Sequence, residues 1–72
     1  MSCYQRIRDL REDNDLTQEK ISSILKIHTS QYKRYEQGKS KIDFDFIVQI
    51  AKLYDVSIDY IAGLTNSKKK EW

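Results

Sequence analysis

The sequence has 72 residues, of which one is cysteine, two are glycine and none is proline. A lone cysteine, Cys3, forms no intrachain disulfide and is typical of a reducing compartment. No apolar run approaches the roughly 20 residues that cross a bilayer, and no signal-peptide pattern opens the chain. We therefore expect one small cytoplasmic domain, stabilised by packed helices and by a partner chain.

Residues with catalytic chemistry are also scarce. His28 is the single histidine, and neither it nor Cys3 has a second base, thiol or carboxylate at ligand spacing. The chain contains no glycine-rich phosphate loop and no nucleophile motif. Capping of helix starts accounts for most of the aspartates after residue 42. We expect no enzyme, cofactor, metal or small-molecule ligand, and a cryptic enzyme is the weakest alternative.

The net charge of +2 is unevenly distributed along the chain. Residues 25–41 carry +4, whereas residues 1–24 carry −1 and residues 42–67 carry −3. A basic stretch between acidic segments is the pattern of a module that presents one face to a polyanion. The alternative is an ordinary solvated face, which most charge runs are.

Apolar residues recur at helical rather than alternating spacing, which predicts an all-α fold of five short helices. Thr17, Asp43 and Ser57 are suited to N-caps, and Gly38 and Gly63 to the left-handed residue that ends a helix. The expected apolar stripes are Tyr4, Ile7 and Leu10, then Ile21 and Leu25, then Phe44, Ile47, Ile50, Ala51 and Tyr54, and finally Ile58 and Ile61, while Tyr32 and Tyr35 lie at i, i+3 spacing on the third helix. The domain should span residues 1–66, with a basic tail at 67–72.

Two short helices joined by a tight turn, the second ending in glycine, form a helix-turn-helix unit. Residues 16–21 read LTQEKI and residues 32–39 read YKRYEQGK, which resembles the LTQEEL…ISRYENGK signature of the Cro/C1-type (XRE) helix-turn-helix family. Residues 47–52 (IVQIAK) and 56–61 (VSIDYI) resemble its fourth and fifth helices. The resemblance covers about residues 4–65 and implies a five-helix, lambda-repressor-like DNA-binding domain.

Three residues depart from the family pattern. Lys26 stands where the family usually has glycine, in the turn between the two motif helices. A lysine there must adopt an unusual backbone conformation, or the turn must differ. Ser22 replaces a small buried alanine and needs a hydrogen-bond partner, and Ile42 replaces a proline.

The resemblance implies that the second motif helix places its N-terminal side chains in the DNA major groove. The expected base-reading residues are Thr29, Ser30, Lys33 and Arg34. Arg34 is the strongest candidate for a base contact, because its planar fork matches guanine O6 and N7. The alternative is that all four lie on a solvated helix face.

Phosphate contacts should flank these readers, fixing the register without carrying sequence information. The expected phosphate-binding residues are Thr17, Gln18, His28, Gln31, Gln37, Lys39, Ser40 and Lys41. Lys39 and Lys41 are equally compatible with free surface lysines. In relatives, an arginine late in the first helix pairs with a glutamate late in the recognition helix, which implies a structural ion pair between Arg11 and Glu36.

The function implied is a sequence-specific transcriptional regulator, a repressor that binds double-stranded DNA as a homodimer on a palindromic operator. The expected dimer contact is an apolar patch of Tyr60, Ile61 and Leu64, with Phe46, Tyr54 or Trp72 as further members. The alternative for Tyr60 is that its side chain belongs wholly to the core. An alternative function is an antitoxin-like module that uses the same fold to bind another protein.

Overall fold

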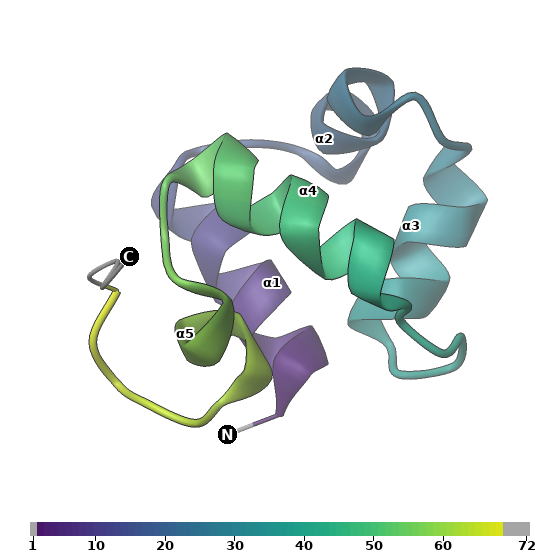
Figure 1. The fold of residues 1–72 in the computed structure, drawn as a ribbon. Coiled ribbons are helices and arrows are strands. Elements are labelled where there is room, and N and C mark those ends of the chain that lie inside the picture. Colours follow the sequence, from purple (N-terminus) through teal and green to yellow (C-terminus); the bar gives the residue numbers. More distant parts are fainter. Residues whose placement is uncertain (1, 69–72) are drawn as a thin grey trace.

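The structure is a computed structural model, and it describes residues 2–68. This range forms α1 (Cys3–Asp13), α2 (Gln18–Leu25), α3 (Thr29–Glu36), α4 (Phe44–Tyr54) and α5 (Ile58–Ala62), and it contains no strand. Figure 1 shows α2 and α3 at one end of the molecule and α5 beside α1 at the other. The prediction of an all-α fold with five helices is confirmed.

Short polar side chains begin four of these helices. Oxygens of Ser2, Thr17, Asp43 and Ser57 accept a backbone N–H three residues further along, which satisfies a donor that the first helical turn leaves unpaired. The three N-caps expected from the sequence are among them. α3 differs, because the side chain of its N-cap residue His28 makes no capping hydrogen bond.

Each helix contributes a side chain with no exposed surface to one shared core. These residues are Ile7, Ile21, Tyr32, Ile50 and Ile61, one from each of α1 to α5 in turn. Complete burial of an aliphatic or aromatic side chain contributes roughly 1.5–3 kcal/mol relative to exposure. The core therefore ties all five helices together, and no helix packs independently of the others.

The expected inward stripes of α1 and α4 are each wrong at their first residue. On α1, Tyr4 is 41% exposed, whereas Ile7 and Leu10 are buried. Phe44 is 65% exposed, whereas Phe46 is buried and its ring centroid lies 4.3 Å from that of Tyr35. Asp43 starts the helix at Phe44, and an inward stripe through Ile50 at i, i+4 spacing begins at Phe46 rather than two residues earlier. Phe46 therefore belongs to the core and not to an exposed apolar patch.

The expected dimer patch is also largely internal. Ile61 is completely buried and Tyr60 is 7% exposed, because α5 packs against α1 and α4. The Tyr60 ring faces the Arg6 guanidinium, whose carbon lies 4.1 Å from the ring centroid. Tyr54 is partly buried against the core. Of the residues proposed for this patch that the structure describes, only Leu64 is strongly exposed, at 79%.

The chain after α5 folds back over the first helix. Arg6 Nη2 donates to Asn66 Oδ1 at 2.8 Å, and Lys68 Nζ lies 3.5 Å from Asp13 Oδ2. The Ser57 N–H donates to the Lys68 carbonyl. The first two residues of the expected basic tail thus lie along the domain, while residues 69–72, including Trp72, fall outside the described range.

None of the helices in residues 2–68 has the length and apolar character needed to cross a bilayer.

Lys26 adopts the left-handed conformation, with φ 60° and ψ 41°, in the turn between α2 and α3. The turn is closed by the Ile27 N–H, which donates to the Ser22 carbonyl, and the Lys26 N–H, which donates to the Ser23 carbonyl. The turn therefore keeps the geometry that glycine favours although a β-carbon is present. Ser22, the second departure, donates its hydroxyl to the Gln18 carbonyl and is thereby satisfied.

We expect Lys26→Gly to raise the free energy of unfolding by about 1 kcal/mol, because glycine removes the left-handed strain of a β-carbon. Lys26→Ala is the matched control, since it removes the charge but keeps the strain. Urea denaturation of the three proteins measures the difference. A glycine variant no more stable than the alanine variant would show that the turn stores no strain.

Candidate nucleic-acid interface

The inward face of α3 is fixed by two tyrosines. Tyr32 has no exposed surface, and Tyr35 packs on Phe46 of α4. Helix α2, which precedes the turn, packs against α3. These contacts determine which side chains of α3 face outward.

The four expected base-reading residues lie on or beside this outward face. Ser30, Lys33 and Arg34 are exposed, and Thr29 is partly buried at the start of the helix. The guanidinium of Arg34 donates from Nε to Ser40 Oγ at 3.0 Å. A helix that is packed through tyrosines on one side and is polar and basic on the other can lie in the major groove, with its exposed side chains facing the base edges.

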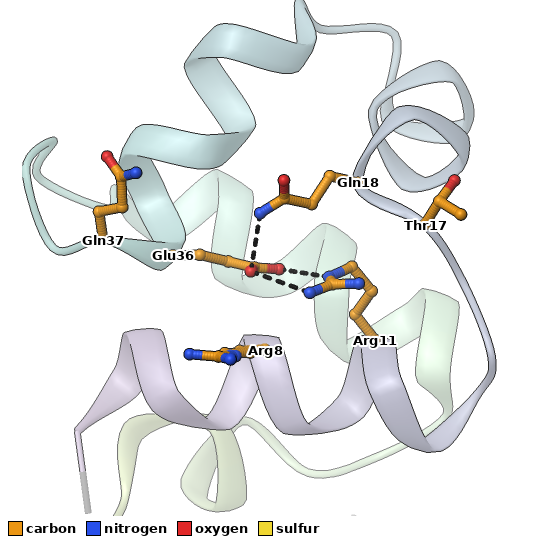
Figure 2. A pocket seen from close by; sticks show the side chains of 6 residues that line it. All are labelled: Arg8, Arg11, Thr17, Gln18, Glu36 and Gln37. Atoms are coloured by element: carbon orange, nitrogen blue, oxygen red, sulfur yellow. Dashed lines mark hydrogen bonds and ion pairs between the residues drawn. The ribbon is translucent and has the colours of Figure 1, made fainter.

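Three of the expected phosphate-binding residues line one surface hollow of about 460 Å³. Thr17 and Gln18 line it at the start of α2, and Gln37 lines it at the end of α3, with the Gln18 side chain directed toward Glu36 (Figure 2). Arg8, Arg11 and Glu36 complete the lining. The N-terminal end of α2 and two amides therefore meet at one polar concavity.

The other expected phosphate-binding residues are spread around α3. His28 precedes the helix and is exposed, while Gln31 is partly buried. In the loop after the helix, Lys39 and Lys41 are exposed and Ser40 is partly buried. These residues therefore lie before, within and after α3 along the chain.

Glu36 lies at the centre of a hydrogen-bonded cluster between α1, α2 and α3. Arg11 Nε donates to Glu36 Oε2 at 2.7 Å, and Arg11 Nη2 donates to Glu36 Oε1 at 3.3 Å. Gln18 Nε2 donates to the same Oε1 at 3.2 Å (Figure 2). Arg11 Nη1 also donates to the Leu16 carbonyl. The ion pair that the family resemblance implies is thus present as a bidentate salt bridge. Gln18 adds a further hydrogen bond to the same carboxylate.

Burial shapes the ionisation of this cluster. The Glu36 and Arg11 side chains are only 5% and 13% exposed. Burial by itself would raise the pKa of Glu36, but hydrogen bonds from Arg11 and Gln18 outweigh it and hold that pKa below its usual value. Burial and the neighbouring Glu36 carboxylate raise the pKa of the Tyr32 hydroxyl, which stays neutral. Arg11 and Glu36 satisfy their polar atoms within this buried salt bridge, whereas the buried Tyr32 hydroxyl beside it has no hydrogen-bond partner among the described residues.

The lowered pKa of Glu36 has a consequence for acid stability. A carboxyl whose pKa is lower in the folded than in the unfolded state stabilises the fold above its unfolded value of about 4.3. That stabilisation is lost as the pH falls through the lower, folded pKa. We therefore expect Glu36→Gln to be less stable than the natural protein at pH 7, and the difference to shrink progressively below about pH 4.3. Denaturation curves at several pH values measure it, and a difference independent of pH would contradict the assignment.

Comparison with known proteins agrees with this geometry. Residues 4–67 match a family described as a helix-turn-helix domain. The matched range contains all five helices except Cys3, the first residue of α1. The chain belongs to the Cro/C1-type helix-turn-helix family. This is a family of DNA-binding transcriptional regulators rather than of enzymes.

The relatives of this helix-turn-helix chain are bacterial and phage regulators. It is 46% identical over 66 residues to the uncharacterized HTH-type transcriptional regulator YobD of Bacillus subtilis, covering 92% of this chain and 58% of the relative. It is 30% identical over 70 residues to the HTH-type transcriptional regulator ImmR of Bacillus subtilis, covering 97% and 55%. It is 34% identical over 53 residues to the cryptic phage CTXphi transcriptional repressor RstR of Vibrio cholerae, covering 74% and 48%. The chain spans about half the length of these curated relatives.

Some features of this helix-turn-helix domain were not anticipated from its sequence. Arg8 lines the hollow, and its position one turn before Arg11 on α1 is the signal that would have found it. The contact between Arg34 and Ser40 joins two residues that the sequence assigned to different tasks. Arg6 is 5% exposed, and nothing in the alternation of charged and apolar residues distinguished it from its exposed neighbour Arg8.

Proposed function

We propose that this domain is a sequence-specific double-stranded DNA-binding regulator and acts as a repressor. The observation that carries the proposal is the outward face of α3, where Ser30, Lys33 and Arg34 are exposed on a helix whose other side is locked into the core. The basic stretch of residues 25–41, with a net charge of +4, centres on this helix. The relative RstR is named a transcriptional repressor, which supports repression as the sign of regulation.

In this proposal, Thr29, Ser30, Lys33 and Arg34 read bases in the major groove. The DNA backbone is held on either side of α3. The residues proposed for these phosphate contacts are Thr17, Gln18, His28, Gln31, Gln37, Lys39, Ser40 and Lys41. The hollow shared by Thr17, Gln18 and Gln37 supports a phosphate at the start of α2, since backbone N–H groups there favour an anion.

We also propose a homodimer on two-fold related half-sites about 34 Å apart, one turn of DNA. Burial of Tyr60 and Ile61 removes them from the contact and leaves Leu64, which is 79% exposed directly after α5. Among the residues of the expected patch that lie within residues 2–68, Leu64 is the one left exposed for contact with a second copy.

Selection of bound duplexes from a random pool tests the proposal. We expect one preferred sequence made of two inverted half-sites, with affinity that falls steeply as salt is raised, because bound phosphates release counterions. Absence of DNA binding at low salt by a folded protein would overturn the proposal and favour the antitoxin-like, protein-binding alternative. Preference for a single half-site would retain the DNA-binding function but overturn the dimer.

A further inference from the structure

We propose that Ser40 is a positioning residue for Arg34 and thereby sets the base specificity of the domain. The inference rests on the proposed function, because it assumes that Arg34 reads a base. It gives Ser40 a role beyond the phosphate contact proposed above, since the hydroxyl that accepts from Arg34 still has its own proton to donate.

The chain reversal after α3 brings the two residues together. Gly38 takes the left-handed conformation at φ +73°, and the backbone N–H groups of Lys39 and Ser40 then both donate to the Arg34 carbonyl, at 2.9 and 3.4 Å. A β-carbon at Gly38 would lie 3.1 Å from the Tyr4 ring, so the reversal is packed as well as bent. Ser40 is therefore tied to the backbone of Arg34 while its hydroxyl contacts the side chain of the same residue.

The contact occupies one particular donor of the guanidinium. Arg34 Nε donates to Ser40 Oγ at 3.0 Å. The two Nη groups at the end of the side chain keep their donors, and this end forms the fork that matches guanine O6 and N7. Anchoring Nε restricts rotation of the last torsions of Arg34, so less conformational entropy is lost when the fork meets a base.

A hydroxyl orients the arginine without neutralising it. Glu36 is the one carboxylate in residues 25–41, and it is engaged by Arg11 and Gln18 on the opposite side of α3. Arg34 takes part in none of the ion pairs within residues 2–68, so its charge is free to meet DNA, whereas a carboxylate at position 40 would compete with the base. The geometry combines a fixed direction with an uncompensated charge.

The test compares Ser40→Ala and Ser40→Thr with Ser23→Ala, an exposed serine on α2 outside the proposed interface. Binding is measured on the preferred duplex and on duplexes altered at each position in turn. We expect Ser40→Ala to reduce discrimination at the position read by Arg34 by about 3- to 10-fold, the usual effect of losing one hydrogen bond. Ser40→Thr retains the hydroxyl and should restore discrimination, and Ser23→Ala should change nothing.

Combining Ser40→Ala with Arg34→Ala separates positioning from an independent contact. If Ser40 acts through Arg34, its substitution has no further effect on discrimination once the arginine is gone. Uniform weakening on all duplexes in both backgrounds would overturn positioning and leave Ser40 a phosphate contact only. If Arg34→Ala itself leaves discrimination intact, the positioning role fails with the base-reading role of Arg34, whereas a natural protein without sequence preference would instead overturn the proposed function.

Discussion

Replacement of Arg11 by alanine is expected to lower the free energy of unfolding by about 3 kcal/mol, the lower end of the range for breaking a buried salt bridge. The change leaves the Glu36 carboxylate, 5% exposed, without the guanidinium that donates to both of its oxygens. The lower end applies because Gln18 still donates to Glu36 and because the carboxylate can take up a proton. In a domain of this size the loss corresponds to a fall of roughly 12–24 °C in Tm.

The same helix supplies a matched control. Arg8 also pairs with a carboxylate, Glu12, at 3.5 Å, but the two side chains are 55% and 52% exposed. An exposed pair one turn apart on a helix contributes about 0.3–0.5 kcal/mol, so Arg8→Ala should barely shift the thermal melt. If the two alanine variants melt together, Glu36 is not stabilised by Arg11.

A double variant, Arg11→Met with Glu36→Leu, asks whether the pair stabilises the fold or only avoids an isolated charge. Replacing a buried ion pair by apolar side chains of similar volume is often neutral or stabilising. We expect this variant to recover most of the stability that Arg11→Ala loses. A double variant as unstable as the single one would show that the hydrogen bonds from Gln18 to Glu36 and from Arg11 to the Leu16 carbonyl dominate.

Arg34→Ala is expected to remove discrimination at one base position in each half-site, at about 1–3 kcal/mol per contact. The reason is geometric, since a forked donor pair is matched by guanine and mismatched by the other bases. Comparing bound duplexes selected by the natural protein and the variant measures this change. We expect one position to lose its preference while the others keep theirs.

Arg34→Lys separates charge from shape at the same position. Lysine keeps the positive charge but lacks the planar fork, so the salt dependence of binding should persist while the base preference weakens. Equal weakening on every sequence in both variants, with a smaller salt slope for alanine only, would assign Arg34 to the phosphate backbone.

Local signals in the sequence were sufficient for the helices, whereas the two sides of α3 were assigned through the family resemblance, which places Tyr32 in the core. Thr17, Asp43 and Ser57 are recognisable as caps because a short polar side chain satisfies the first turn wherever it precedes an apolar stripe. The outward position of Lys33 and Arg34 follows from the 3.6-residue period once Tyr32 is taken as internal.

The sequence was a poorer guide where two helical faces compete for burial. Phe44 and Phe46 have the same chemistry, and Phe46 is internal because it shares the face of Ile50 and packs against Tyr35 of α3. The sequence makes Tyr60 and Ile61 candidates for a dimer contact, but the packing of α5 against α1 buries both. Spacing along one helix gives its faces, but which face is covered depends on the neighbouring helices.

The basic stretch of residues 25–41 and the helices within it were determined by the sequence alone, because periodicity, capping and charge are local properties. Only the tertiary structure decided which charged side chains of this stretch turn inward and which turn outward. Glu36 turns inward to Arg11 and Gln18, while Arg34 turns outward to a hydroxyl, Ser40, that the reversal at Gly38 brings beside it. The physical reason is that the cost of burying a carboxylate is offset only where a guanidinium from another helix meets it, and that meeting is a property of the packed domain.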